Sequence, residues 1–294
     1  MPDRTVSSFV KQHPVLSYYV LAFGISWGAI LIAVGPGGFV STTATSPTFA
    51  LVGLASLLGP SLAGVIMTGL VDGGAGFHEL LSRLTRWRVG GRWYAVALLT
   101  APLVTLTTLV PLSFASRAFL PAILTADDKA SLLLSGVATG LIVPVFEELG
   151  WTGFATPQLR QRRGILATGL IMGLLWGAWH FPLFAGSAGS SGALPPTLFL
   201  AAMLFSWLVP YRVLMVWVYD RSESLMLAMV MHVPIVVSQY VLTPEAISGN
   251  AMFVFLVAYA AALWLVVGAV TLRRGSERPG RWVTKESGDM GDSK

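Results

Sequence analysis

Long apolar runs, separated by short polar connections, recur along the whole chain of 294 residues. Eight runs are close to the ~20 residues that a helix needs to cross the hydrocarbon core of a bilayer. They cover residues 14–34, 48–70, 93–114, 131–153, 165–184, 197–219, 224–242 and 251–272. The pattern therefore predicts an all-α fold, a polytopic integral membrane bundle with about eight transmembrane helices.

Residues 1–272 are predicted to form one transmembrane domain, whose ionisable core lies at about 131–242. We expect residues 273–294 to be a disordered cytoplasmic tail, because they contain too few apolar side chains to build a core. The first run is longer than the core of a signal peptide and lacks a clear cleavage site, so we expect a retained helix.

The composition agrees with a membrane protein and excludes several kinds of site. Apolar residues make up 54% of the chain and charged residues only 11%, whereas soluble domains carry about 25% charged residues. The chain has no cysteine, which excludes disulfides, thiolate metal sites and cysteine nucleophiles. The net charge of +5 comes from basic residues in short loops and the tail, a pattern that gives no indication of nucleic-acid binding.

Successive spanning helices place their connections alternately on the two sides of the membrane. Lysine and arginine are distributed unevenly between these two sides. With the N-terminus inside, sixteen of the nineteen fall on the inner side, and only Arg117 and Lys129 fall on the outer side. Short loops rich in Lys and Arg remain in the cytoplasm. We therefore predict a multi-pass protein of the plasma membrane with both termini cytoplasmic and the lipid bilayer as its surroundings.

Five ionisable residues lie inside the apolar runs, at positions Glu147, Glu148, His180, Arg212 and His232. Each costs at least ~2.5 kcal/mol at the bilayer centre when charged, so such groups face the interior of a bundle and have partners. By default, intramembrane acids mark a functional site. The alternative is structural, because buried acids and histidines also join helices through hydrogen bonds.

Glu147 and Glu148 point about 100° apart on a helix and therefore have different roles. One can face a reaction centre while the other is held by a structural partner. Glu147, His180 and His232 come from three helices and can converge on one water molecule. Two His and one Glu are also a zinc-ligand set with an open position. The residues thus leave open either zinc or another divalent metal at these three positions, or a metal-free water activated by Glu.

Three ordered motifs resemble those of the CPBP family of CAAX-protease and bacteriocin-processing intramembrane proteases. Residues 147–154 (EELGWTGF) resemble the first motif, residues 176–184 (WGAWHFPLF) look like the second, and His232 in a later apolar run looks like the third. The resemblance implies a CAAX prenyl protease-like metalloprotease, an intramembrane endopeptidase whose substrate is a membrane-associated peptide or protein. It also implies roles: Glu147 activates water with His180, Glu148 supports the site, and His232 stabilises the carbonyl oxygen.

The chain departs from that family at two positions. Thr152 stands where the first motif usually has Arg, and Val236 stands where an Asn often follows the third-motif His. Arg212 or Arg160 is the expected replacement cation for Glu148. Ser238 and Gln239 are near Val236, but we place both on a different helix face. A hydrogen-bond donor to the carbonyl oxygen of the substrate is then missing. A catalytically weak binding or immunity-type protein on the same scaffold therefore remains an alternative.

If the helices are straight and end where the apolar runs end, the first two motifs lie at different depths in the membrane. Glu147 is then near the inner end of its helix and His180 near the outer end of the next, about 15 Å apart in depth. We expect the first of these helices to continue past Gly153 toward Arg160, which places Glu147 deeper. A proton-coupled transporter is a further alternative, disfavoured by the absence of a visible internal repeat.

Overall fold

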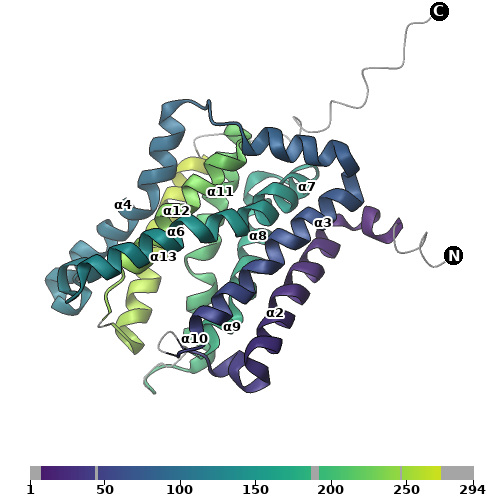
Figure 1. Ribbon diagram of the computed structural model, residues 1–294. Helices are drawn as coiled ribbons and strands as arrows, with labels where there is room; N and C mark the ends of the chain where they lie inside the picture. The colour runs from purple at the N-terminus through teal and green to yellow at the C-terminus, as the bar shows by residue number, and fades with distance from the viewer. Residues whose placement is uncertain (1–7, 44–45, 187–191, 246, 273–294) are drawn as a thin grey trace, which may run out of the picture.

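The computed structural model describes residues 8–43, 46–186, 192–245 and 247–272. Every regular element in these ranges is helical, which confirms the all-α prediction (Figure 1). The tail at 273–294 lies outside the described residues. The principal helices are α2 (Pro14–Ser41), α3 (Phe49–Leu84), α4 (Gly91–Ala115), α6 (Lys129–Gly150), α7 (Thr156–Arg160), α8 (Ile165–Trp179), α9 (Phe181–Ala185), α10 (Pro196–Phe205), α11 (Leu208–Ser222), α12 (Leu225–Val241) and α13 (Gly249–Leu272).

All eight predicted runs are helical, and the described residues contain six helical stretches long and apolar enough to cross a membrane. Two of the six are composite: 129–160 joins α6 to α7, and 196–222 joins α10 to α11. The remaining runs form α8, with 15 residues, and α12, with 17. At 1.5 Å per residue both are shorter than the hydrocarbon core of about 30 Å. The protein is therefore a polytopic helical membrane protein with two short inner helices.

Two helices extend beyond their predicted ends because they bend at a glycine. Helix α3 has 36 residues and continues to Leu84, past the predicted end at residue 70. It turns at Gly73, whose φ of +59° is a left-handed conformation that glycine adopts without a steric penalty. Helix α2 turns in the same way at Gly35, with φ of +68°. The predicted apolar runs end just before these two glycines, so the apolar pattern missed the second part of each helix.

The fourth helix continues past Gly153, as expected. Helix α6 leads into a π-helical turn, η2 (Trp151–Ala155), and then into α7, which ends at Arg160. Glu147 thus lies 13 residues before this end, and His180 lies 15 residues after Ile165, where the next helix begins. These intervals correspond to about 20 and 22 Å of helix. The two motif residues therefore have similar depths in the bundle.

The predicted inner connections meet at one end of the molecule. Arg86, before α4, forms an ion pair of 2.7 Å with Glu223, after α11. Arg160, at the end of α7, donates from Nε to Asp220 at 2.8 Å. This common end is what the alternating topology requires; which side of the membrane it faces stays a prediction.

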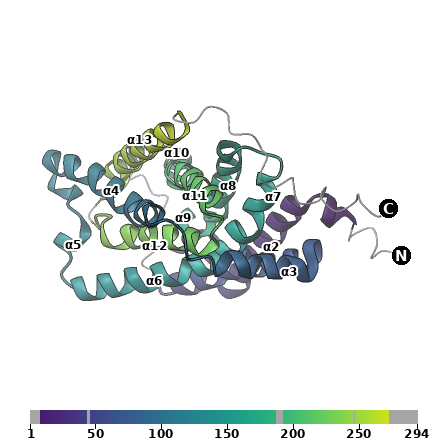
Figure 2. The ribbon, with the colours of Figure 1, turned by 90° about the horizontal axis from the view of Figure 1, so that it is seen from above.

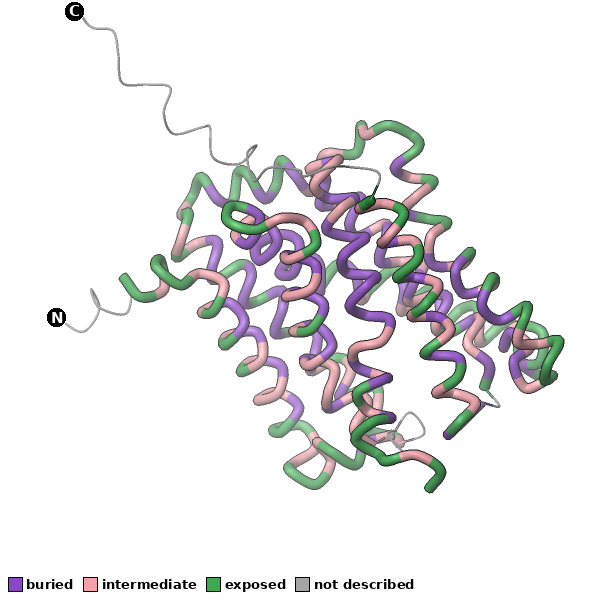
Figure 3. The backbone as a smooth tube through the Cα atoms, turned by 180° about the vertical axis from the view of Figure 1, so that it is seen from behind, coloured by how far each residue is buried: buried purple, intermediate pink, exposed green. Residues whose placement is uncertain are grey.

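Buried residues concentrate on the helix sides that face the middle of the bundle (Figure 3). Helices α11 and α12 lie in the interior, between α6 on one side and α13 with α10 on the other (Figure 2). Helix α8 packs along α11 at very short range. A Cβ on Gly173 would lie 2.6 Å from the Cα of Val209. This close approach positions α8, which carries the second motif, against α11, which carries Arg212.

Gly150, at the end of α6, packs as closely against α3 and α2 and offers a test of the packing. A Cβ there would lie 2.0 Å from the Pro60 carbonyl oxygen and 2.3 Å from the Tyr18 hydroxyl oxygen. We expect Gly150→Ala to lower the free energy of unfolding by about 1–3 kcal/mol, the usual effect of overpacking. Thermal unfolding in detergent measures this effect. The control is Gly28→Ala, where the new Cβ meets nothing within 4 Å; equal melting of both variants would contradict the packing.

Candidate active site

Glu148 is the centre of a fully buried ion network. Its side chain has no exposed surface, and Arg212, equally buried, donates from Nη1 to both carboxylate oxygens at 3.0 Å. Thr152, one turn further along the helix, donates its hydroxyl to the same carboxylate. His232 Nδ1 lies 2.8 Å from Oε1. The replacement cation expected from the sequence is therefore Arg212, whereas Arg160 pairs with Asp220.

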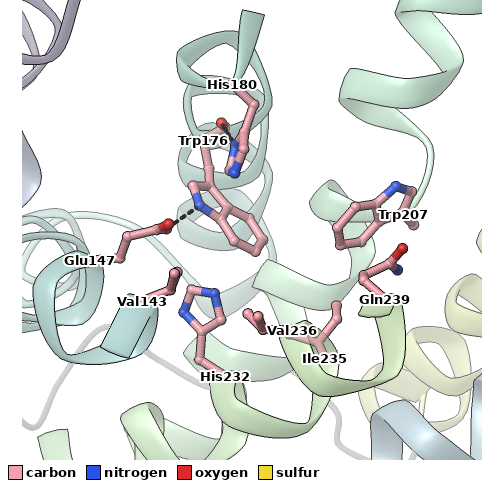
Figure 4. A pocket seen from close by; sticks show the side chains of 9 residues that line it. All are labelled: Val143, Glu147, Trp176, His180, Trp207, His232, Ile235, Val236 and Gln239. Carbon is pink, nitrogen blue, oxygen red and sulfur yellow. Dashed lines mark hydrogen bonds between the residues drawn. The ribbon is translucent and has the colours of Figure 1, made fainter. Parts of the chain in front are cut away.

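Glu147 points in another direction, as the 100° offset predicts, and is held by two indoles. Trp176 of α8 donates from Nε1 to Oε2 at 2.7 Å, and Trp151, one turn further along, donates to the same oxygen at 3.2 Å. Figure 4 shows the carboxylate beside Trp176. Both contacts are to one oxygen, and no hydrogen bond from a described residue engages Oε1. That oxygen remains available for a further partner.

Trp176 connects the two acids and both histidines. The Cζ atom of Arg212 lies 4.2 Å from its ring centroid, a cation–π contact in a buried setting. The rings of His180 and His232 pack edge-on against it, with centroids at 5.4 and 5.3 Å. One indole thus receives the guanidinium on its face and donates to Glu147 from its edge. The orientations of Glu147 and Arg212 therefore depend on this side chain.

The hydrogen bonds of the two histidines define their neutral tautomers. His180 Nδ1 lies 2.8 Å from the carbonyl oxygen of Trp176, which can only accept, so Nδ1 carries the proton. His232 Nδ1 faces the Glu148 carboxylate, which accepts in the same way. In each neutral ring Nε2 then carries a lone pair. Both Nε2 atoms can therefore take a proton or a hydrogen bond from a bound molecule.

Glu147, His180 and His232 line a single cavity, as the sequence predicts (Figure 4). The centres of water molecules can occupy a volume of about 60 Å³ in this cavity. About 10–15 Å³ measured in this way is enough for one water molecule. Its walls come from α6, α8, the segment between α10 and α11, and α12. The lining residues are Val143, Glu147, Trp176, His180, Trp207, His232, Ile235, Val236 and Gln239.

Comparison with known proteins agrees with the motifs that build this cavity. Residues 129–237 match the family described as Rce1-like, type II CAAX prenyl endopeptidase Rce1-like. Residues 129–237 belong to the CPBP family. A protein named CAAX prenyl protease 2 from Methanococcus maripaludis is 28% identical over 128 residues, which cover 42% of this chain and 47% of that protein. The chain thus spans about half the length of this relative.

One sequence prediction about the residues around the cavity is wrong. Gln239 lines the cavity, although we placed it on a different helix face. Seven residues separate it from His232, and seven residues fall only about 20° short of two full helical turns. The comparison with Val236, three residues before Gln239, hid the helix face that Gln239 shares with His232. Counting from His232 identifies Gln239 as a member of the same face.

Other cavity residues of the CPBP-family region carried weaker signals in the sequence. Val143 lies one turn before Glu147, a spacing that can be recognised once Glu147 is chosen. The donation of the Trp151 and Trp176 indoles to Glu147 had no distinct signal, because the chain contains ten Trp residues. Trp207 stands between two helices and no motif indicates it.

The described residues contain no group of three His, Asp or Glu side chains close enough to hold a metal ion. Glu147 engages two indoles through one oxygen, and each histidine engages a protein acceptor through Nδ1. The predicted ligand set of Glu147, His180 and His232 stays a prediction.

Proposed function

We propose that this chain is an intramembrane endopeptidase that hydrolyses peptide bonds of membrane-associated proteins or peptides. The observation that supports it most is the cavity shared by Glu147, His180 and His232 within a CPBP-family region. Peptide hydrolysis needs a base for water and a donor for the developing oxyanion. The cavity provides a carboxylate oxygen and two imidazole nitrogens for these tasks.

In the proposed reaction, a water molecule held by Glu147 Oε1 and His180 Nε2 loses a proton as its oxygen attacks the peptide carbonyl. The electron pair of the C=O double bond moves onto the carbonyl oxygen, where His232 stabilises it. Collapse of this intermediate breaks the C–N bond. The proton taken from water passes to the leaving nitrogen, which departs as an amine, and the new carboxyl group keeps the oxygen of water.

The charged groups around the cavity place His232 beside an acceptor. Glu147 and Glu148 are the acids of this buried set, and Arg212 is its guanidinium. When His232 carries a proton on each ring nitrogen, Glu148 still accepts from Nδ1. The Nε2–H of the resulting imidazolium then donates to the oxyanion. Glu148 and Arg212 act as positioning residues in this account.

The proposed substrate is a lipid-anchored peptide segment, presented from the cytoplasmic side of the plasma membrane. The cavity lies among helices whose outer faces expose large apolar side chains, such as Leu134, Leu141 and Leu174. A substrate that is itself held in the bilayer reaches such a site without crossing from water. The name of the Methanococcus maripaludis relative, CAAX prenyl protease 2, supports a prenylated C-terminal peptide as the first substrate to test.

The assay uses purified protein in vesicles with a quenched, farnesylated peptide. We expect cleavage of this peptide and slower cleavage of the same peptide without its lipid. Because the described side chains provide a base and acceptors without a three-ligand group, we expect activity to survive extensive chelation with EDTA and 1,10-phenanthroline. Elemental analysis of the active fraction should then show less than one metal per chain. Activity that is lost on chelation and restored by zinc would contradict the metal-free route.

A further inference from the structure

The Glu147 carboxylate accepts two hydrogen bonds at one of its two oxygens. The Trp176 indole of α8 donates to Oε2 at 2.7 Å (Figure 4), and the Trp151 indole, in the η2 turn, donates to the same atom at 3.2 Å. A carboxylate oxygen has two lone pairs, and at Oε2 both are then in use. The plane of the carboxylate is thereby fixed, and Oε1 is the oxygen left for a molecule in the cavity that Glu147 lines.

Trp176, which makes the shorter of the two bonds, is itself held from several sides. The Arg212 guanidinium lies on its face, with Cζ 4.2 Å from the ring centroid, and Arg212 is fixed in turn by its ion pair with Glu148. The rings of His180 and His232 pack edge-on against the same indole. The side chain is buried. An indole surrounded in this way cannot turn its N–H in another direction without moving a charged neighbour.

Trp151, the second donor, is held by aromatic rings of α2 and α8. The Tyr19 ring of α2 stacks on it, with the ring centroids 5.5 Å apart and 26° between the ring planes. Trp179 packs edge-on against it at 5.7 Å, and the Trp179 N–H donates to Ser26 Oγ of α2 at 2.8 Å. Helix α2 lies outside residues 129–237, which match the family. The contacts that hold the Glu147 carboxylate therefore extend beyond the matched region.

We propose that the Trp176 and Trp151 indoles are positioning residues that determine which oxygen of Glu147 acts as the base. This role rests on the proposed endopeptidase function. The terminal torsion of a Glu side chain is otherwise broad, so a free carboxylate would present its oxygens to the water over a range of angles. With Oε2 held by two donors, Oε1 meets the attacking water at a fixed position. Both indoles act through Glu147.

Replacing Trp176 with benzothienylalanine tests this role, because sulfur takes the place of the N–H in a ring of nearly the same size. We expect kcat for the farnesylated peptide to fall about 10- to 100-fold, since a catalytic group misplaced by about 1 Å can cost 10²-fold, while KM changes by less than about twofold. Trp151→Phe should cost less, because its 3.2 Å contact is the longer one. The matched control is Trp93→Phe, which removes a buried indole outside the cavity and should leave both constants unchanged.

Nuclear magnetic resonance of the indole N–H groups tests the two hydrogen bonds without any substrate. With ¹⁵N-labelled tryptophan, the chain gives ten indole signals, and those of Trp176 and Trp151 are assigned by their loss in the Phe variants. We expect both to move in Glu147→Gln, because a neutral amide oxygen accepts more weakly than a carboxylate, while the signal of Trp93 stays in place. Unmoved signals would overturn the proposal even if no peptide is cleaved. A full kcat of the benzothienylalanine protein, beside an inactive Glu147→Gln, would overturn it and leave the protease function standing.

Discussion

Arg212→Met is expected to lower the free energy of unfolding by about 3–5 kcal/mol, because it leaves the Glu148 carboxylate buried without a cation. Both side chains have no exposed surface, and Nη1 of Arg212 contacts both carboxylate oxygens. Thr152 and His232 still hydrogen-bond the carboxylate in the variant. Neither residue restores the full charge, since His232 is positive only when protonated.

Two further variants show whether charge, rather than packing, causes this loss. Arg92→Met removes an exposed arginine that also lies over an indole, with Cζ 5.2 Å from the Trp93 centroid, and should change stability by at most about 0.5 kcal/mol. Combining Arg212→Met with Glu148→Gln removes both charges and should recover much of the loss. Unfolding by denaturant in detergent micelles measures all four proteins. A double variant as unstable as Arg212→Met would mean that Arg212 acts through its packing on Trp176.

Glu147→Gln is expected to lower kcat by about 10²- to 10⁴-fold, the contribution of a general base. The amide keeps an oxygen that can accept from the Trp151 and Trp176 indoles, so the fold should be retained. Its other atom is an NH₂ group, which cannot take a proton from water. Initial rates with the farnesylated peptide, corrected for folded protein, measure the effect.

The neighbouring Glu148→Gln provides a matched control for the same substitution. Glu148 pairs with Arg212, so its replacement should lower stability by more than Glu147→Gln does, since a buried guanidinium loses its partner. The two variants should therefore separate, one by loss of kcat and the other by loss of stability. Equal stability losses with equal residual rates would contradict the division of roles between the two acids.

The helical membrane fold could be predicted because apolar length alone determines where a chain can cross a bilayer. What could not be predicted is where a helix continues after its hydropathy falls. The turn at Gly73 is one case, since a positive φ at glycine lets a second helical part follow in a new direction. The passage from Gly153 to Arg160 also lies beyond its apolar run, but it was predicted. There we expected continuation only because the depths of Glu147 and His180 required it.

The candidate site could be predicted for those residues that are costly to place in lipid. Glu147, His180 and His232 are costly in lipid, so a shared interior was expected, and the cavity they line confirms it. Their catalytic roles stay predictions. The place of Gln239 was wrong because a neutral amide has a low burial cost and gives no comparable signal. Its helical position relative to His232 was the only available indication.

The most direct test of the central claim is mass spectrometry of the products formed in ¹⁸O-labelled water. Vesicles with the wild type or with Glu147→Gln would receive the farnesylated peptide. We predict that the wild type cuts one internal peptide bond and places one ¹⁸O atom in the new carboxyl group, while the variant, folded to the same extent, yields almost none. An uncut peptide with folded wild type, or equal cleavage by both proteins, would contradict a protease whose water is activated by Glu147.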